Sequence, residues 1–123
     1  MKHLALVGIG GCLGAIARYK LGGLVLHYTT GWKFPASTFL INICGCLVAG
    51  ILAGLVEKHD FFHQDARIFL FTGLLGGFTT FSAFSLETVY LLQRREILWG
   101  VLSASSSVLF GILALWFGIK IIP

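Results

Sequence analysis

Charged residues are scarce in this chain. Asp, Glu, Lys and Arg make up only 11% of its 123 residues, and just five residues are acidic, whereas soluble domains carry about 25% charged residues. Hydrophobic residues reach 57%, and a soluble domain this small cannot remove so much apolar surface from water. The composition therefore excludes an ordinary soluble domain and predicts an integral membrane protein.

Long polar segments are also missing. Four apolar stretches are separated by short polar joints, and each stretch has about the 20 residues that a helix needs to cross a bilayer. The first stretch is too long for a signal peptide, and we interpret it as a retained helix. We predict one all-α membrane domain over residues 1–123, with four transmembrane helices at roughly 4–26, 34–56, 68–92 and 97–122.

Several functional classes lack the side chains that they need. No Asp or Glu lies deep within a predicted span, which disfavours a proton-coupled cation exporter and a cation channel lined by acidic rings. No nucleophile–base pair or catalytic metal cluster is visible, so the sequence gives an enzyme no support. Lys and Arg are spread over the helix ends, which disfavours nucleic-acid binding. Cys12, Cys44 and Cys46 all lie inside spans, where we expect small buried residues.

The positive charges give almost no signal for orientation. An excess of Lys and Arg normally marks the cytoplasmic side, but here the two sides are nearly equal. The side with both termini carries Lys2, Lys58, Arg67 and Lys120, and the other carries Arg18, Lys20, Lys33, Arg94 and Arg95. Either a weak bias is settled by another signal, or the chain inserts both ways round. Our working hypothesis is the second, with pairing as an antiparallel homodimer.

Small residues recur within the first two spans. Gly10-x-x-x-Gly14 and Gly50-x-x-x-Gly54 predict helix faces that another helix can approach closely. Arg18 lies late in the first span, and two interpretations remain open for it. Its side chain either reaches the membrane surface or supplies positive potential at the mouth of an anion path.

Hydrogen-bonding side chains lie within the second and fourth spans. Thr38 and Asn42 are four residues apart and share a helix face; taken alone, Asn42 is best explained as a contact between helices. Ser103 and Ser107 share a face in the same way, although serine hydroxyls often bond to their own helix. Together with Thr80, these residues could form a track of hydrogen-bond donors.

The third span contains a poor helix interior. Gly76-Gly77 is followed closely by Thr79-Thr80, and each Gly costs about 1 kcal/mol relative to Ala in a helix. A break at this depth frees backbone groups that lipid cannot satisfy, so they must face protein, water or an ion. Broken helices often build ion sites. A simple kink is the alternative.

Aromatic side chains follow the predicted break. Phe78, Phe81 and Phe84 recur every third residue, a pattern that usually marks packing or lipid contact. An aromatic ring has a positive edge, so Phe81 and Phe84 could instead present their edges to an anion. For Glu87, which follows near a membrane surface, we expect an exposed or capping role.

Three motifs carry a resemblance to a known family. The chain resembles the Fluc/CrcB family of bacterial fluoride channels in Gly10-Gly-x-x-Gly14-x-x-x-Arg18-Tyr19, in Thr38-x-x-x-Asn42, and in Gly73-x-x-Gly76-Gly77-Phe78-Thr79-Thr80-Phe81-Ser82-x-Phe84-Ser85-x-Glu87. The resemblance covers all four spans. It implies a fluoride-selective channel in the bacterial inner membrane that passively exports cytoplasmic fluoride and protects the cell, without an organic cofactor.

The resemblance also implies roles for single residues. Asn42 would donate its amide to fluoride, Phe81 and Phe84 would offer ring edges, and Arg18 would lie at the vestibule. Thr38, Thr80 and Ser107 would line the pathway. Ser103 takes the place of a Tyr found in many relatives, so its role in the pathway is less certain. The backbone carbonyls of Gly76 and Thr79 would hold a structural sodium ion at the centre of an antiparallel homodimer with two pathways.

Two other functional classes compete with the channel. A small dual-topology multidrug transporter has the same size and number of spans, but it needs a buried carboxylate in the first span, where none is found. A membrane scaffold subunit needs only the glycine faces. It leaves Asn42 and the irregular third span unexplained.

Overall fold

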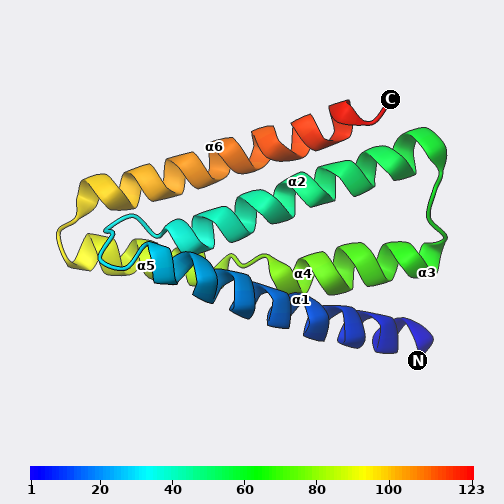
Figure 1. The fold of residues 1–123 in the computed structure, drawn as a ribbon, viewed down its shortest axis with the longest axis horizontal. Coiled ribbons are helices and arrows are strands. Elements are labelled where there is room, and N and C mark those ends of the chain that lie inside the picture. The colour runs from blue at the N-terminus through cyan, green and yellow to red at the C-terminus, as the bar shows by residue number, and fades with distance from the viewer.

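The chain forms four helical rods that lie side by side. The computed structural model describes all residues from 1 to 123. Both termini and the connection between the second and third rods lie at one end (Figure 1). The elements are α1 (Lys2–Tyr28), α2 (Ala36–His59), a third rod made of α3 (Gln64–Arg67), the π-helix η1 (Ile68–Leu75), α4 (Gly76–Phe78) and α5 (Ser82–Gln93), and finally α6 (Ile97–Ile121).

The four predicted spans are confirmed, with shifts of a few residues at their ends. All four rods are long and apolar enough to cross a membrane. The predicted start of the second span at residue 34 is two residues early, because Pro35 precedes the first turn of α2 and lies at its N-cap. Apolar runs in lipid form helices because a helix satisfies its own backbone hydrogen bonds.

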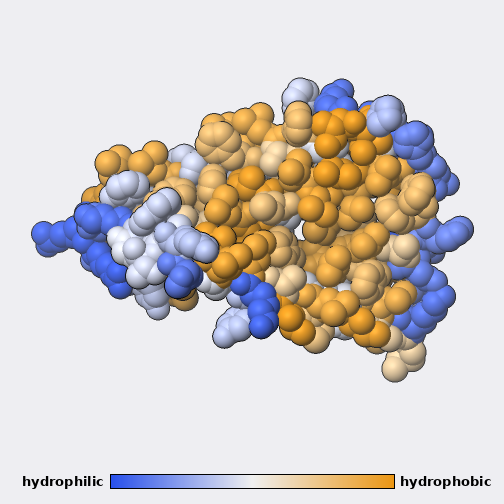
Figure 2. Space-filling view, viewed as in Figure 1, coloured by the Kyte–Doolittle hydropathy of each residue, from blue (hydrophilic) through white to orange (hydrophobic).

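The surface has the polarity of a membrane protein. Apolar residues cover most of the body of the molecule, and most hydrophilic residues gather at its two ends, apart from a small hydrophilic group at the lower edge (Figure 2). Very few large side chains are fully buried, as expected where lipid rather than water meets the outer surface. The chain is therefore a multi-pass membrane protein. The expectation that all three cysteines are buried is wrong for the single chain: Cys12 and Cys44 are exposed, and Cys46 is half-buried beside Gly111 of α6.

Glycine allows α1 to touch the third rod, as predicted. A Cβ atom on Gly10 would lie 2.7 Å from the carbonyl oxygen of Phe69, and one on Gly14 would collide with the carbonyl oxygen of Leu74. Real side chains never come so close to a backbone. The face of Gly10 and Gly14 is thus a helix-packing face within one chain.

A second glycine face joins α2 to α6. A Cβ atom on Gly50 would collide with the carbonyl oxygen of Leu115, and one on Gly54 would lie 3.0 Å from the carbonyl oxygen of Ile119. Gly118 of α6 has the same role in return, against the carbonyl oxygen of Leu47. The predicted packing role of Gly50 and Gly54 is confirmed.

The third rod is broken, and the break lies later than the glycines alone predict. Gly76 and Gly77 remain helical, while Thr79 adopts an extended conformation with ψ 156° and α5 begins at Ser82. Gly77, which is still helical, packs against the backbone of Gly11 in α1. The alternative of a simple kink is wrong, since no helix connects Phe78 to Ser82.

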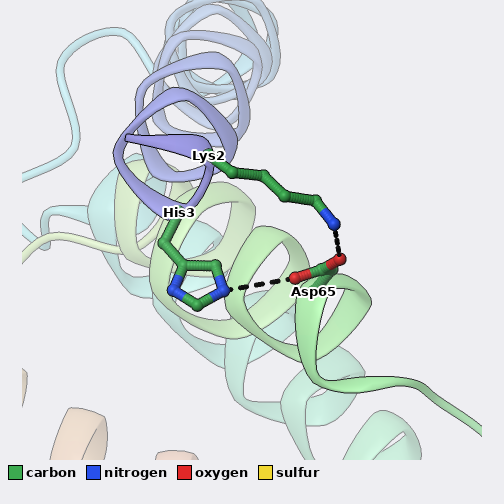
Figure 3. A network of polar contacts seen from close by, with 3 residues as sticks. All are labelled: Lys2, His3 and Asp65. Atoms are coloured by element: carbon green, nitrogen blue, oxygen red, sulfur yellow. Dashed lines mark hydrogen bonds and ion pairs between the residues drawn. The ribbon is translucent and has the colours of Figure 1, made fainter.

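Polar contacts join the first and third rods at the end that carries the termini. Lys2 forms an ion pair with Asp65, and His3 Nε2 lies 3.2 Å from the same carboxylate (Figure 3). The start of α1 is therefore attached to α3, just before the apolar part of the third rod.

Candidate functional site

Asn42 stabilises the broken segment of the third rod. Its Nδ2 donates to the carbonyl oxygen of Thr80 at 2.9 Å, and its Oδ1 accepts from the Thr80 N–H at 2.8 Å. The side chain thereby satisfies both backbone groups of Thr80, which lipid could not do. A side-chain amide has two N–H donors, so one donor of Asn42 is left without a protein partner. Both the packing role and a ligand role are therefore compatible with its geometry.

The break leaves the backbone carbonyls of four consecutive residues, from Gly76 to Thr79, without hydrogen-bond partners in the chain. In a continuous helix the N–H of Thr80 would donate to Gly76 and that of Ala83 to Thr79. Instead Thr80 donates to Asn42, and Ala83 donates to the Thr80 hydroxyl at 3.2 Å. The carbonyl oxygens of Gly76 and Thr79 accept no hydrogen bond from the chain. Carbonyl oxygens are ligands that hard cations prefer, so these two residues fit the cation site that the resemblance implies.

A cleft of about 770 Å³ collects three of the predicted site residues. Arg18 of α1, Thr38 of α2 and Thr80 of the break all line it, with Tyr19 and Ser82 beside them. Arg18 is half-buried and has no carboxylate partner. Its charge is therefore uncompensated at the cleft, which favours the interpretation that Arg18 supplies positive potential to an anion path.

The third rod presents an aromatic pair next to Asn42. The ring centroids of Phe81 and Phe84 lie 5.7 Å apart, with the planes tilted by 45°. Phe81 is 79% exposed in the single chain and lines a cavity of about 230 Å³ with Asn42, Thr79 and Thr80. The free amide donor, the Thr80 backbone and one aromatic ring thus meet in one place.

The serines of α6 lie apart from these cavities. Ser103 is 1% exposed, and its hydroxyl has no hydrogen-bond partner in the chain. Ser107 is half-buried. Neither lines the cleft with Arg18 or the cavity with Asn42. The single chain therefore does not bring the two serines together with the other predicted site residues.

Comparison with known sequences identifies the family. A family model described as CrcB-like protein, Camphor Resistance (CrcB), matches residues 5–119. The chain belongs to the CrcB-like family. A CrcB-like relative from Methylobacillus flagellatus, named fluoride-specific ion channel FluC, is 51% identical over 99% of this chain and 95% of its own.

Other relatives with the same name support the assignment. The protein from Nitratidesulfovibrio vulgaris is 40% identical over 97% of this chain and 95% of its own, and the one from Flavobacterium psychrophilum is 44% identical over 98% and 97%. The likeness to these CrcB-like proteins therefore extends over all four rods.

One polar contact of this CrcB-like chain was not anticipated. Thr38 Oγ1 donates to Glu87 Oε1 at 2.6 Å, and Glu87 Oε2 is buried without a partner. The expectation that Glu87 is exposed or caps a helix is wrong, because α5 turns this residue towards α2. A signal was present: Glu87 is the one acidic residue within the predicted third span, where a carboxyl needs a polar partner. While Thr38 donates to Glu87, its hydroxyl hydrogen is not free to donate to an anion.

Proposed function

We propose that this protein is a fluoride-selective channel that lets cytoplasmic fluoride leave passively across the bacterial inner membrane and so protects the cell. The likeness to relatives named fluoride-specific ion channels, up to 51% identical over nearly the full chain, carries the proposal. The multidrug transporter and scaffold alternatives are not favoured, since neither accounts for this likeness.

The polar groups of the site suit a small anion. A pore must replace the water around its ion with its own groups, and the groups here are hydrogen-bond donors and positive ring edges. Arg18 attracts the anion into the cleft, where the hydroxyl groups of Thr80 and Ser82 lie 3.5 Å apart and can turn their hydrogens towards it. The spare N–H of Asn42 and the edges of Phe81 and Phe84 then contact the anion. Thr38 joins this lining when its bond to Glu87 opens.

We further propose that the working unit is an antiparallel homodimer of chains with dual topology. Two observations support it: nearly equal numbers of Lys and Arg lie at the two ends, and Phe81 is largely exposed at mid-membrane depth. A second copy would cover this ring and complete two pathways. In the dimer the buried hydroxyl of Ser103 and the half-buried Ser107 would extend the polar lining.

A sodium ion fits this dimer as a structural component. The partnerless carbonyls of Gly76 and Thr79 would hold it, and the ion would supply positive charge that compensates these oxygens. Two oxygens are too few to surround a hard cation. The same carbonyls of the second copy would therefore complete the site at the dimer centre.

Anion efflux from liposomes tests the proposed function. The purified protein is reconstituted into vesicles loaded with potassium fluoride or potassium chloride, and release is followed with ion-selective electrodes. Fast fluoride release with little chloride release is expected. Trapped fluoride from a protein that is folded and dimeric would contradict the channel and return the transporter and scaffold to consideration.

A further inference from the structure

We propose that the end of the molecule opposite the termini binds the phosphate group of an anionic phospholipid. A cavity of about 240 Å³ lies there between the end of α1, the connection into α2 and the end of α5. Its lining includes Thr29, Trp32, Lys33, Phe34, Tyr90 and Arg94. This cavity shares Leu26 and Ser37 with the cleft that holds Arg18, but its cations are different ones and the proposal does not depend on fluoride transport.

Two cations face the cavity. Lys33 Nζ lies 2.9 Å from Glu96 Oε1, which leaves its other N–H donors available. Arg94 has no carboxylate within ion-pair distance and is exposed. Its planar guanidinium can donate two parallel hydrogen bonds to a phosphate. Glu87 also lines the cavity but is bonded to Thr38, so the phosphate is expected at the outer part, beside Lys33 and Arg94.

The cavity lies at the depth of the lipid headgroups. It is formed where α1 and α5 end, and Trp32 and Tyr90 in its lining are 64% and 49% exposed. Trp and Tyr concentrate at this membrane interface. Leu26 and Leu91 make the remaining wall apolar, which suits the first carbons of an acyl chain. A basic pocket between helix ends is a common kind of site for lipid headgroups.

The opposite end has a smaller excess of positive charge, since its four Lys and Arg residues face three carboxylates. Lys2 and Arg67 are each paired there with an aspartate, and Lys58 donates to the carbonyl oxygen of Ile122. At the end with the cavity, five Lys and Arg residues face only two carboxylates, Glu87 and Glu96. Binding of an anionic lipid is therefore expected at this end of the chain.

Native mass spectrometry of the detergent-purified full chain tests the proposal. The protein is titrated with phosphatidylglycerol and, in parallel, with phosphatidylcholine, and bound lipid is counted. Preferential binding of phosphatidylglycerol is expected. Arg94→Gln and Lys33→Gln should each weaken it about tenfold, as for a lost hydrogen bond to a charged group. Two variants are used so that misfolding of one still leaves a readable result.

Arg95→Gln is the matched control, because Arg95 neighbours Arg94, carries the same charge and does not line the cavity. Its binding should stay within about twofold of the unaltered chain. An equal loss in Arg95→Gln and Arg94→Gln would overturn the site and leave only diffuse attraction to a basic surface. Displacement of the lipid by millimolar inorganic phosphate would also overturn it, in favour of a site for free anions.

Discussion

At the scale of single residues, polar side chains of the site form hydrogen bonds to the protein as well as being available to the proposed anion. Asn42 holds the Thr80 backbone with one N–H and its oxygen, and only its second N–H is left for an anion. Thr38 gives its hydrogen to Glu87. Substitution of these residues therefore changes both the lining of the proposed pathway and the stability of the fold. Each variant must be chosen so that one of these two effects dominates the measurement.

Asn42→Asp should abolish anion passage. A carboxylate removes the spare donor, repels the anion and places an oxygen against the Thr80 carbonyl. Loss of hydrogen bonds to a charged group predicts that fluoride efflux from liposomes falls by about 10- to 100-fold or more. Unchanged efflux would show that Asn42 does not contact the anion in the pathway.

Phe81→Ile and Phe84→Ile should each impair fluoride efflux while the protein stays folded and dimeric by size-exclusion chromatography. An aliphatic side chain fills similar space but lacks the positive edge that an aromatic ring presents. Phe117→Ile, on an exposed part of α6, is the control and should conduct normally. If both site variants match the control, the two rings are packing residues only.

Thr38→Val should destabilise the chain. It leaves the half-buried Glu87 carboxyl without its donor, at a cost of about 1–3 kcal/mol. Thr38→Ser keeps a hydroxyl and should lie close to the unaltered protein. Thermal unfolding in detergent compares the two, and equal midpoints for Val and Ser would show that the Thr38–Glu87 hydrogen bond contributes nothing to stability.

At the scale of helices, the sequence predicts which helices and packing faces exist better than it predicts where the break lies and which side chains meet. Hydropathy places all four spans, and glycine spacing predicts both packing faces. The break lies at the end of the predicted Gly76–Thr80 segment rather than at its glycines: Asn42 of α2 binds the Thr80 backbone, while Gly77 is still helical where it packs against Gly11 of α1. The partner of Glu87 is missed for the same reason. Both depend on contacts between rods, which local sequence patterns do not contain.

Gly14→Ala and Gly23→Ala form a matched pair that tests the packing of α1. A Cβ atom on Gly14 collides with the Leu74 backbone, whereas one on Gly23 meets nothing within 4 Å. Overpacking costs about 1–3 kcal/mol, so Gly14→Ala should lower the melting temperature in detergent. Gly23→Ala should leave it unchanged or raise it, since Ala favours a helix. Equal melting temperatures would contradict close packing at Gly14.

At the scale of the whole molecule, charge balance and apolar surface act together. Its ends carry four and five Lys and Arg residues, and apolar residues cover most of the body between them (Figure 2). Such a chain has little electrostatic preference for either orientation. The proposed antiparallel dimer requires both orientations to be populated.

Removing charge from one end should therefore reduce function without altering the residues that line the proposed pore. In a chain with Lys20, Arg94 and Arg95 all changed to Gln, the side with the termini has four Lys and Arg residues against two on the other side, and it should become cytoplasmic. A reporter fused to the C-terminus reads the orientation. Fluoride efflux should fall severalfold as antiparallel pairs are lost; normal efflux from chains of one orientation would contradict the antiparallel dimer.

The arrangement of α1 has a consequence for biosynthesis. Its glycine face packs on η1 and α4, and its first residues, Lys2 and His3, bind Asp65 (Figure 3). All of these partners are synthesised after α2. A ribosome that stalls before residue 65 would leave α1 in the bilayer with its glycines against lipid and with Lys2 and His3 without Asp65. Nascent chains of that length are expected to be degraded by membrane proteases, because they are not stable folding intermediates.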